Sequence, residues 1–266
     1  MRAQLAPARP KCSVSLVMND PLQNWPRIQT VGLSGLVVRF GPAFDDRANR
    51  AAIAFRAAVD AEKWPEVEES SSTLVSAFFR VDLAEHDMSL LSARLQEVLD
   101  QQDWLDAPFP ANRSRWTIPA SFGGTCGPQL EEAAALAGLD PDAAIASLAA
   151  AQLRVLTLGF APGQPYLGSL DANWQIPRQS QITKAVPAGA LVVAVQQFCL
   201  FTASAPTGWR HVGQTVFRPF RSDAEDPCPL RPGDEVHFTQ VSETELESIE
   251  AKDNCGNGGA ERVQIG

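Results

Sequence analysis

The segments 155–170 (VLTLGFAPGQPYLGSL) and 186–195 (VPAGALVVAV) are the most informative about the fold of the second half of this 266-residue chain. In both segments, glycine or proline interrupts short runs of apolar and β-branched residues. Similar runs follow at FCLFTA (198–203), TVFRPF (215–220) and DEVHFTQV (234–241). Strands at this spacing predict an all-β barrel or sandwich, which we place over residues 116–242.

The first half of the chain has a different pattern. Strand-like runs occur within 27–41 and 73–81, and an alanine-rich helical run covers 44–63. Apolar residues that share one helical face follow at 90, 91, 95, 98 and 99. These features predict a β-α-β-α order and a small α+β domain over residues 26–105. The sequence also predicts a disordered extension over 1–25, helices within 129–153 and, from its acidic and glycine-rich composition, a flexible tail over 243–266.

Composition excludes several classes of protein. The formal net charge is −9, which makes a nucleic acid an unfavourable partner. No apolar run reaches the length of a membrane span, and no apolar segment of a secretory signal follows the N-terminal basic residues. The five cysteines are scattered and never form a CxxC pair, so we expect neither a disulfide framework nor a metal site, and we expect a cytoplasmic protein.

Common catalytic motifs are missing. The chain has no GxxxxGK[ST] loop, no HExxH and no GxSxG elbow, and its three histidines lie far apart in sequence. Residues 159–168 are the most unusual segment, with three glycines and two prolines in ten residues. Such a loop can turn backbone N–H groups towards an anion or a carbonyl oxygen. The alternative is a tight corner packed by Phe160 and Tyr166.

Three further sites are candidates for chemistry. Arg178 follows a proline and could clamp a carboxylate or phosphate through two hydrogen bonds. Gln197 could present its amide to a substrate, and residues 207–209 with His211 could form an aromatic rim. The alternatives are a solvated surface arginine, a hydrogen bond at a strand edge and a structural histidine.

The motifs together resemble a known family. The chain reads GFAPGQPYLGSL at 159–170, PRQ at 177–179, VPAGAL at 186–191, PTGW at 206–209, VGQT at 212–215 and LRPGDEVHF at 230–238. Upstream, IPASFGGTCGPQLEEAAALAGL occupies 118–139. These segments resemble, in order, the family that includes the PxpB component of 5-oxoprolinase, allophanate hydrolase subunit 1 and KipI, a family of carboxyltransferase C/D-type domains. The resemblance extends over about residues 26–240.

The resemblance implies an α+β fold, with a small ferredoxin-like N-terminal domain followed by a cyclophilin-like β-barrel. It implies a subunit of an ATP-dependent amide (C–N) hydrolase that opens 5-oxoproline to glutamate with ATP and Mg²⁺. The implied partners are a larger subunit of the KipA, PxpC or allophanate hydrolase subunit 2 type and a third subunit of the LamB/YcsF type. A KipI-like inhibitor of a histidine kinase and an inactive scaffold subunit are the alternatives.

The resemblance also implies roles for individual residues. Arg178 and Gln197 are the predicted catalytic residues. The predicted residues for binding substrate or nucleotide are Gly159, Phe160, Pro162, Gly163, Pro165, Tyr166, Gly208, Trp209, His211 and Thr215. The chain departs from the family pattern at Leu148, Gln164 and Phe198, and we expect the bulky Phe198 to narrow the cleft. These departures predict an altered substrate or a weakened activity.

Overall fold

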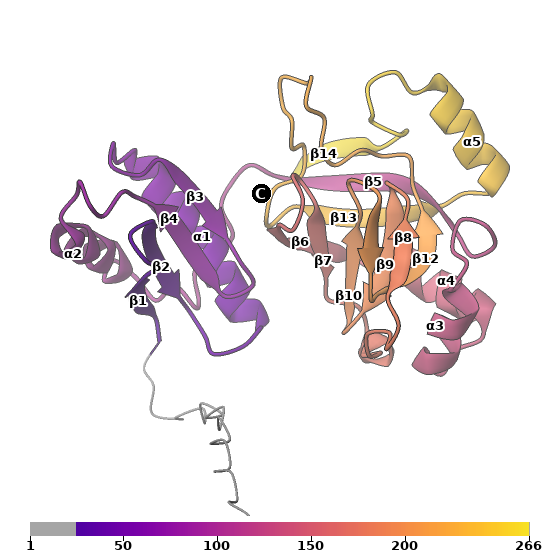
Figure 1. The fold of residues 1–266 in the computed structure, drawn as a ribbon, viewed down its shortest axis with the longest axis horizontal. Helices are drawn as coiled ribbons and strands as arrows, with labels where there is room; N and C mark the ends of the chain where they lie inside the picture. The colour runs from indigo at the N-terminus through magenta and orange to yellow at the C-terminus, as the bar shows by residue number, and fades with distance from the viewer. Residues whose placement is uncertain (1–24, 266) are drawn as a thin grey trace, which may run out of the picture.

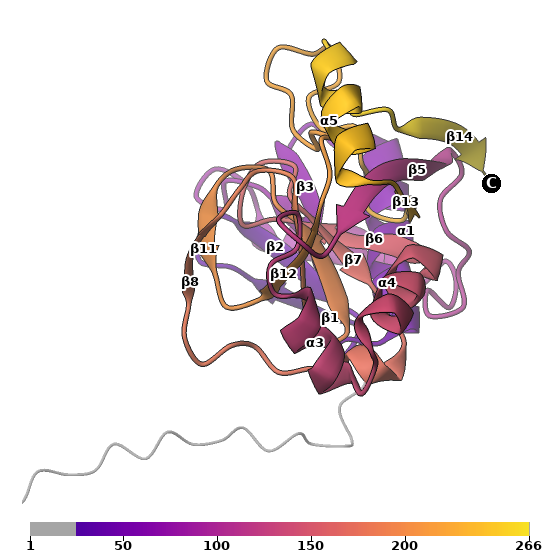
Figure 2. The ribbon, with the colours of Figure 1, turned by 90° about the vertical axis from the view of Figure 1, so that its right-hand side faces the viewer.

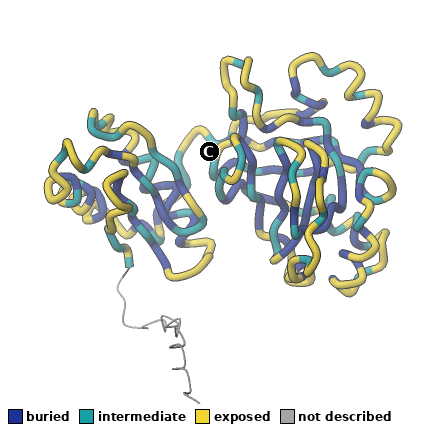
Figure 3. The backbone as a smooth tube through the Cα atoms, viewed as in Figure 1, coloured by how far each residue is buried: buried dark blue, intermediate teal, exposed yellow. Residues whose placement is uncertain are grey.

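Two separate hydrophobic cores divide the chain into two lobes (Figure 1). The computed structural model describes residues 25–265. The predicted extension over 1–25 therefore lies, except for Trp25, outside the described residues. A smoothed trace coloured by burial shows that buried segments run through the interior of both lobes (Figure 3).

The N-terminal lobe is a four-stranded antiparallel sheet with two helices. Its elements are β1 (Arg27–Thr30), β2 (Gly35–Arg39), α1 (Asp46–Glu62), β3 (Glu69–Ser72), β4 (Ser76–Arg80) and α2 (Met88–Leu99). The strand order is β1-β2-β4-β3. Asp45 and Asp87 begin the two helices, and each side chain accepts a hydrogen bond from a backbone N–H of the first turn.

The ββαββα order differs from the predicted β-α-β-α order and from the βαββαβ order of a ferredoxin-like domain, which is not confirmed. The sequence pattern missed β1 (RIQT) and β3 (ESSS), which are the two edges of the sheet. An edge strand can be polar because backbone hydrogen bonds to one neighbour hold it in place.

The second lobe is a closed barrel of seven strands, which confirms the predicted barrel and the α+β class. The strands follow the order β12-β9-β10-β7-β6-β13-β5, and β12 pairs again with β5. They are β5 (Arg113–Phe122), β6 (Leu153–Leu158), β7 (Pro165–Gly168), β9 (Ala190–Ala194), β10 (Gln197–Leu200), β12 (Arg210–Gln214) and β13 (Glu235–Gln240). Helices α3 (Leu130–Ala137) and α4 (Pro141–Ala150) pack against the barrel core through alanines and Leu148.

Further elements lie outside the barrel. Strands β8 (Thr183–Val186) and β11 (Ala205–Thr207) form a separate two-stranded ribbon, and η1 (Ala172–Trp174) precedes β8. A small hydrophobic cluster contains Val186 from the ribbon and Val192, Cys199 and Trp209 from the barrel or its edge.

The predicted flexible tail is wrong for residues 243–265. They form helix α5 (Glu243–Lys252) and strand β14 (Glu261–Ile265), which lie beside β5 at one side of the barrel (Figure 2). Ser242 and Glu245 make a capping box, Leu246 is buried, and β14 pairs with β5. The buried Leu246 and Ala260, together with the pairing of β14 with β5, hold a segment whose own hydrophobic pattern is too weak to predict it.

In the described part of the chain, no single helix is long and apolar enough to cross a membrane. Helices α3 and α4 meet the length and composition criteria only when taken together, and they are bent by 87° at the break between them.

Polar contacts join the two lobes. Asn49 of α1 is fully buried, and its Nδ2 donates to the carbonyl oxygen of Leu156 on β6 at 3.0 Å. Arg154 of the same strand donates to Asn49 Oδ1 at 3.2 Å and to Asp46 Oδ1 at 2.6 Å. The Thr157 hydroxyl donates to the carbonyl oxygen of Ser72 at 2.7 Å. Because Asn49 is buried, removal of its side chain would leave polar groups of the joint buried and unpaired.

Candidate functional site

A pocket of about 350 Å³ lies between barrel strands β7 and β10 and the β8–β11 ribbon. We refer to it as the ribbon pocket. Five of the predicted site residues line it: Phe160, Tyr166, Arg178, Gly208 and Trp209. The other lining residues are Gln164, Gln179, Ile182, Cys199, Phe201, Pro206 and Thr207.

Aromatic rings form one wall of the ribbon pocket and orient its one arginine. The rings of Tyr166 and Trp209 meet edge to face, with centroids 5.9 Å apart. The guanidinium of Arg178 lies 5.7 Å from the Trp209 ring centroid. The backbone of Trp209 is also held in place. Its backbone N–H donates to Thr207 Oγ1, and its carbonyl oxygen accepts from Gln179 Nε2. The arrangement places an exposed cation above a fixed ring, as in a site for a small carboxylate with an apolar body.

The half-buried Tyr166 hydroxyl and the buried Cys199 thiol form the floor of the ribbon pocket. Burial raises the pKa of the Tyr166 hydroxyl, and the neighbouring Cys199 thiol raises it further. Burial also raises the pKa of Cys199. The Gln164 side chain, hydrogen-bonded to both groups, acts in the opposite direction. At neutral pH, Tyr166 is therefore a neutral hydrogen-bond donor rather than a base.

The glycines and prolines of 159–165 shape the pocket rather than line it. The Gly159 N–H donates to the carbonyl oxygen of Gln164, and the Gln164 N–H donates to that of Ala161. These two N–H groups are thus used within the loop and do not face a ligand. The loop holds Phe160 at a φ of 72° with 75% of its surface exposed, at the rim of the pocket.

Both the backbone conformation and the surroundings of position 163 require a glycine. Its φ is 65°, and a Cβ at this position would lie 2.5 Å from the carbonyl oxygen of Pro219. The loop therefore packs directly on the segment that follows β12. The tight-corner interpretation accounts for Gly159, Pro162, Gly163 and Pro165, whereas Phe160 and Tyr166 reach the pocket.

The remaining predicted site residues, Gln197, His211 and Thr215, do not line the ribbon pocket. Gln197 begins β10 opposite Ala194. His211 is buried on β12, and its N–H donates to Gln129 Oε1. The Thr215 hydroxyl donates to the carbonyl oxygen of Pro119 at 2.7 Å, which is a structural contact.

The expectation that Phe198 narrows the cleft is wrong. Phe198 is fully buried in the barrel core, with its ring 5.7 Å from that of Phe238. Side chains alternate along β10, so Phe198 points into the barrel and Cys199 points towards the ribbon pocket.

Sequence reasoning placed Thr207 in an aromatic rim but did not assign Gln164, Gln179, Ile182, Cys199, Phe201 or Pro206 to the site. Strand alternation could have placed Cys199 and Phe201 on one face of β10 and its continuation. Gln179 and Ile182 carry no such signal, because they lie in an irregular segment before β8.

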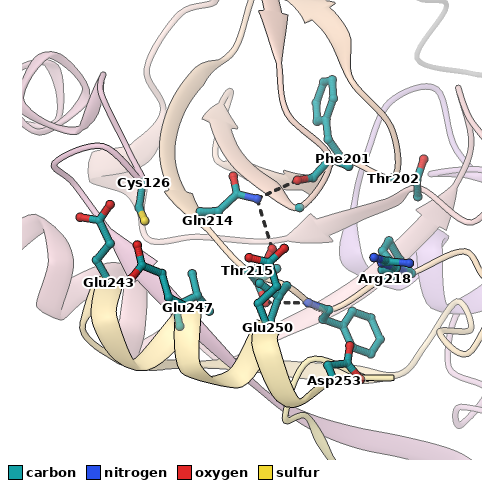
Figure 4. Close-up of a pocket in the computed structure, with 16 residues that line it drawn as sticks. Cys126, Phe201, Thr202, Gln214, Thr215, Arg218, Glu243, Glu247, Glu250 and Asp253 are labelled. Carbon is teal, nitrogen blue, oxygen red and sulfur yellow. Dashed lines mark hydrogen bonds between the residues drawn. The ribbon is translucent and has the colours of Figure 1, made fainter. Parts of the chain in front are cut away.

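A second pocket, of about 270 Å³, lies between α5 and one end of the barrel (Figure 4). Glu243, Glu247 and Glu250 project from α5 towards it, and Thr215 lines it as well. The Nε2 atom of Gln214 donates to the carbonyl oxygens of Ala188 and Thr215. The three glutamate carboxylates of α5 make this second pocket unfavourable for a phosphate group.

Comparison with known proteins gives the family. The model of the carboxyltransferase domain, subdomain C and D, matches residues 26–230. The B-type component of 5-oxoprolinase from Bacillus subtilis (strain 168) is 29% identical over 86% of this chain and 98% of its own length. The protein of the same name from Escherichia coli O157:H7 is 34% identical over 54% of this chain and 66% of its own length.

Solved structures agree on the fold. TTHA0988 superposes with a TM-score of 0.67 at 27% identity over 78% of this chain, but this match covers only 40% of TTHA0988. The urea amidolyase of K. lactis gives a TM-score of 0.70 over 92% of this chain and 17% of its own length, at 18% identity, and supports the fold alone. The chain therefore belongs to the carboxyltransferase domain family, subdomains C and D, together with the B-type 5-oxoprolinase components that resemble it.

Proposed function

We propose that this chain is a subunit of an ATP-dependent 5-oxoprolinase, in which the ribbon pocket binds 5-oxoproline while its ring amide is hydrolysed to glutamate. One observation carries the proposal. This chain aligns with 98% of the length of a B-type 5-oxoprolinase component, and it has a small aromatic pocket with a single arginine at its mouth. 5-Oxoproline has the matching chemistry, with a compact ring, one carboxylate and one amide.

Each lining group has a role in this proposal. Arg178 binds the substrate carboxylate, and Trp209 and Phe160 contact the ring. The Tyr166 hydroxyl donates a hydrogen bond to the amide carbonyl and stabilises the negative charge that develops there. Gln164, which is buried beside Tyr166, takes the orienting role that the sequence predicted for Gln197. The attacking water and its base come from another subunit.

The ribbon pocket does not fit ATP with Mg²⁺. Arg178 is the only charged residue among those that line it, whereas a triphosphate needs several cations or a nest of N–H groups. No group of three or more His, Cys, Asp or Glu residues in the described part of the chain could hold a metal ion. We therefore assign nucleotide binding to the assembled complex rather than to this pocket.

A larger partner subunit follows from the same proposal. TTHA0988 is a longer chain, of which the matched part is 40%, so in that protein this fold is joined to further sequence. We propose that a KipA, PxpC or allophanate hydrolase subunit 2 type protein supplies the corresponding part, with a LamB/YcsF-type third subunit. We also propose a cytoplasmic location, because the four cysteines in the described residues are free thiols.

The test is ATP-dependent release of glutamate from 5-oxoproline by this chain co-purified with its larger subunit. Arg178→Ala should lower kcat/KM about 10- to 100-fold, mostly through KM, because it removes the charged partner of the carboxylate. Arg178→Lys should recover part of the loss. Arg115→Ala, which removes an exposed arginine paired with Glu235 on the other side of the barrel, is the matched control and should keep wild-type activity.

Unchanged kcat/KM for Arg178→Ala in an active complex would refute the assignment of the pocket. A stable complex that turns over neither 5-oxoproline nor allophanate would instead favour a binding or scaffold role.

A KipI-like regulator is the second candidate, and one observation favours it. Phe160 and Ile182 flank the mouth of the ribbon pocket with 75% and 67% of their surfaces exposed. In this alternative, the exposed apolar pair would form part of the contact with the kinase. If the chain regulates a histidine kinase, Phe160→Ser should abolish inhibition, whereas Arg178→Ala should leave it unchanged.

A further inference from the structure

Two polar side chains from one segment face the interior of the ribbon pocket. Gln164 immediately precedes β7, and Tyr166 lies two positions further along the chain, so the two side chains share one face of the strand. Both of them line the pocket. Gln164 is only 1% exposed, as is Cys199, and these are the most deeply buried side chains of the lining.

The strand pairing brings a third polar group to the same place. Cys199 of β10 lies directly opposite Tyr166 of β7. The Gln164 side chain hydrogen-bonds to the Tyr166 hydroxyl and to the Cys199 thiol. Burial raises the pKa of both groups, so both are protonated at neutral pH and this end of the pocket carries no charge.

Gln164 and Tyr166 together offer a ligand one donor and one acceptor. A primary amide has two N–H donors and a carbonyl acceptor, and a hydroxyl both donates and accepts. If Gln164 Nε2 donates to the Tyr166 oxygen, the hydroxyl proton and Gln164 Oε1 remain for a ligand. If the hydroxyl donates to Oε1 instead, Nε2 and a hydroxyl lone pair remain. The pair therefore presents a donor beside an acceptor in either orientation of the amide.

The effect of Gln164 on its neighbours favours the first orientation. Its side chain lowers the pKa of Tyr166 and that of Cys199, against the effect of burial. A hydrogen bond lowers the pKa of an acidic group when the partner donates to the charged form. Gln164 therefore donates to both groups through Nε2, and Oε1 is the acceptor that remains.

The ring amide of 5-oxoproline has the complementary pair of groups. A five-membered ring holds its amide in the cis form, so the N–H and the C=O lie side by side on one edge. We propose that Gln164 and Tyr166 recognise this edge, with the Tyr166 hydroxyl donating to the ring carbonyl and Gln164 Oε1 accepting from the ring N–H. Gln164 then selects small lactam acids with a free N–H and rejects lactones of the same shape. This inference rests on the proposed function, which assigns 5-oxoproline to the ribbon pocket.

Calorimetric titration of the co-purified complex without ATP tests the inference. The probes are 5-oxoproline and 5-oxotetrahydrofuran-2-carboxylate, the lactone of the same shape. The wild type should bind the lactone about 10- to 100-fold more weakly, because the ring oxygen of the lactone would face Oε1 with no proton between them. Gln164→Met keeps a side chain of similar length without the amide. It should weaken binding of the lactam about tenfold and remove most of the difference between the two probes.

Two further variants separate recognition of the N–H from general damage to the pocket. Tyr166→Phe removes the donor to the carbonyl, which both probes have, so it should weaken both about tenfold and leave their ratio unchanged. Gln175→Met changes an exposed glutamine outside the pocket and should alter neither affinity. Circular dichroism confirms that each variant is folded.

Equal affinity of the wild type for the two probes, or no binding of the lactam, overturns the inference. An unchanged ratio in Gln164→Met overturns it too, as does a ratio that changes in Tyr166→Phe alone. If the same complex hydrolyses 5-oxoproline when ATP is added, the proposed function survives such a result. Conversely, lactam selectivity that depends on Gln164 in a complex that hydrolyses nothing supports the inference and refutes the proposed function.

Discussion

A chain of side-chain amides connects the ribbon pocket to the start of α3. Gln129 Nε2 donates to Gln179 Oε1 at 2.8 Å, and Gln179 Nε2 donates to the carbonyl oxygen of Trp209. Gln129 Oε1 accepts from the N–H of His211 at 2.9 Å. The two contacts of Gln129 join residues 50 and 82 positions apart, so no local pattern could have predicted them. They fix the backbone of Trp209 and hence the pocket wall.

The imidazole of His211 makes the stability of the folded protein sensitive to pH. Burial lowers the pKa of His211 below 6.5, so the unfolded chain takes up a proton at a pH at which the folded protein does not. The contribution of the uncharged His211 imidazole to the free energy of unfolding is complete above pH 6.5. It is lost as the pH falls from 6.5 towards the lowered pKa of the folded state.

We therefore predict that His211→Gln flattens the pH dependence of the free energy of unfolding in the window that begins near pH 6.5 and extends to lower pH. The wild type should lose up to about 1.4 kcal/mol for each pH unit in this window. Urea unfolding at several pH values measures both slopes. Parallel curves for the variant and the wild type would show that His211 does not cause the effect.

At the scale of elements, local pattern and tertiary context contributed differently. The alternation of β10 places Phe198 in the core and Cys199 outside it, and this could be predicted from strand geometry. The polar edge strands β1 and β3 could not, because their pairing depends on neighbouring backbone. The loop between β6 and β7 could be predicted only in part. Its glycines predict a tight turn, but only the fold shows that Pro219 lies against Gly163.

This loop provides a matched pair of glycine substitutions. Gly163→Ala should destabilise the protein by about 2–4 kcal/mol, because it combines a positive φ with a clash against the carbonyl oxygen of Pro219. Gly124→Ala also has a positive φ, but no atom lies within 4 Å of the added Cβ, so it should cost only about 1 kcal/mol. Chemical denaturation measures both changes. Equal costs would mean that backbone strain alone accounts for the glycine at 163.

At the scale of the whole molecule, Asn49 determines how firmly the lobes are joined. Its amide contacts Leu156 and Arg154 across the joint and is fully buried. Neither the composition of α1 nor its helical pattern distinguishes this asparagine from a surface residue.

We predict that Asn49→Ala lowers the free energy of unfolding by about 2–4 kcal/mol, because it leaves buried polar groups unpaired. Calorimetry should then resolve two transitions, since the lobes lose much of their coupling. Asn173→Ala, at an exposed position in η1, is the control and should keep the wild-type profile. A single transition with an unchanged midpoint for Asn49→Ala would show that other contacts hold the joint.

The pattern of the amino-acid sequence was enough to predict the barrel and the two-part organisation of the chain, and the resemblance of its motifs to a known family indicated the family and the residues proposed for the ribbon pocket. The pattern predicted the barrel and the two lobes because hydrophobic periodicity and glycine–proline spacing report local burial and backbone geometry. The folded structure was needed to place Gln197, His211 and Thr215 and to show that residues 243–265 form a helix and a strand. These features depend on contacts between residues far apart in the chain, and a one-dimensional pattern does not encode which polar groups meet when the chain folds.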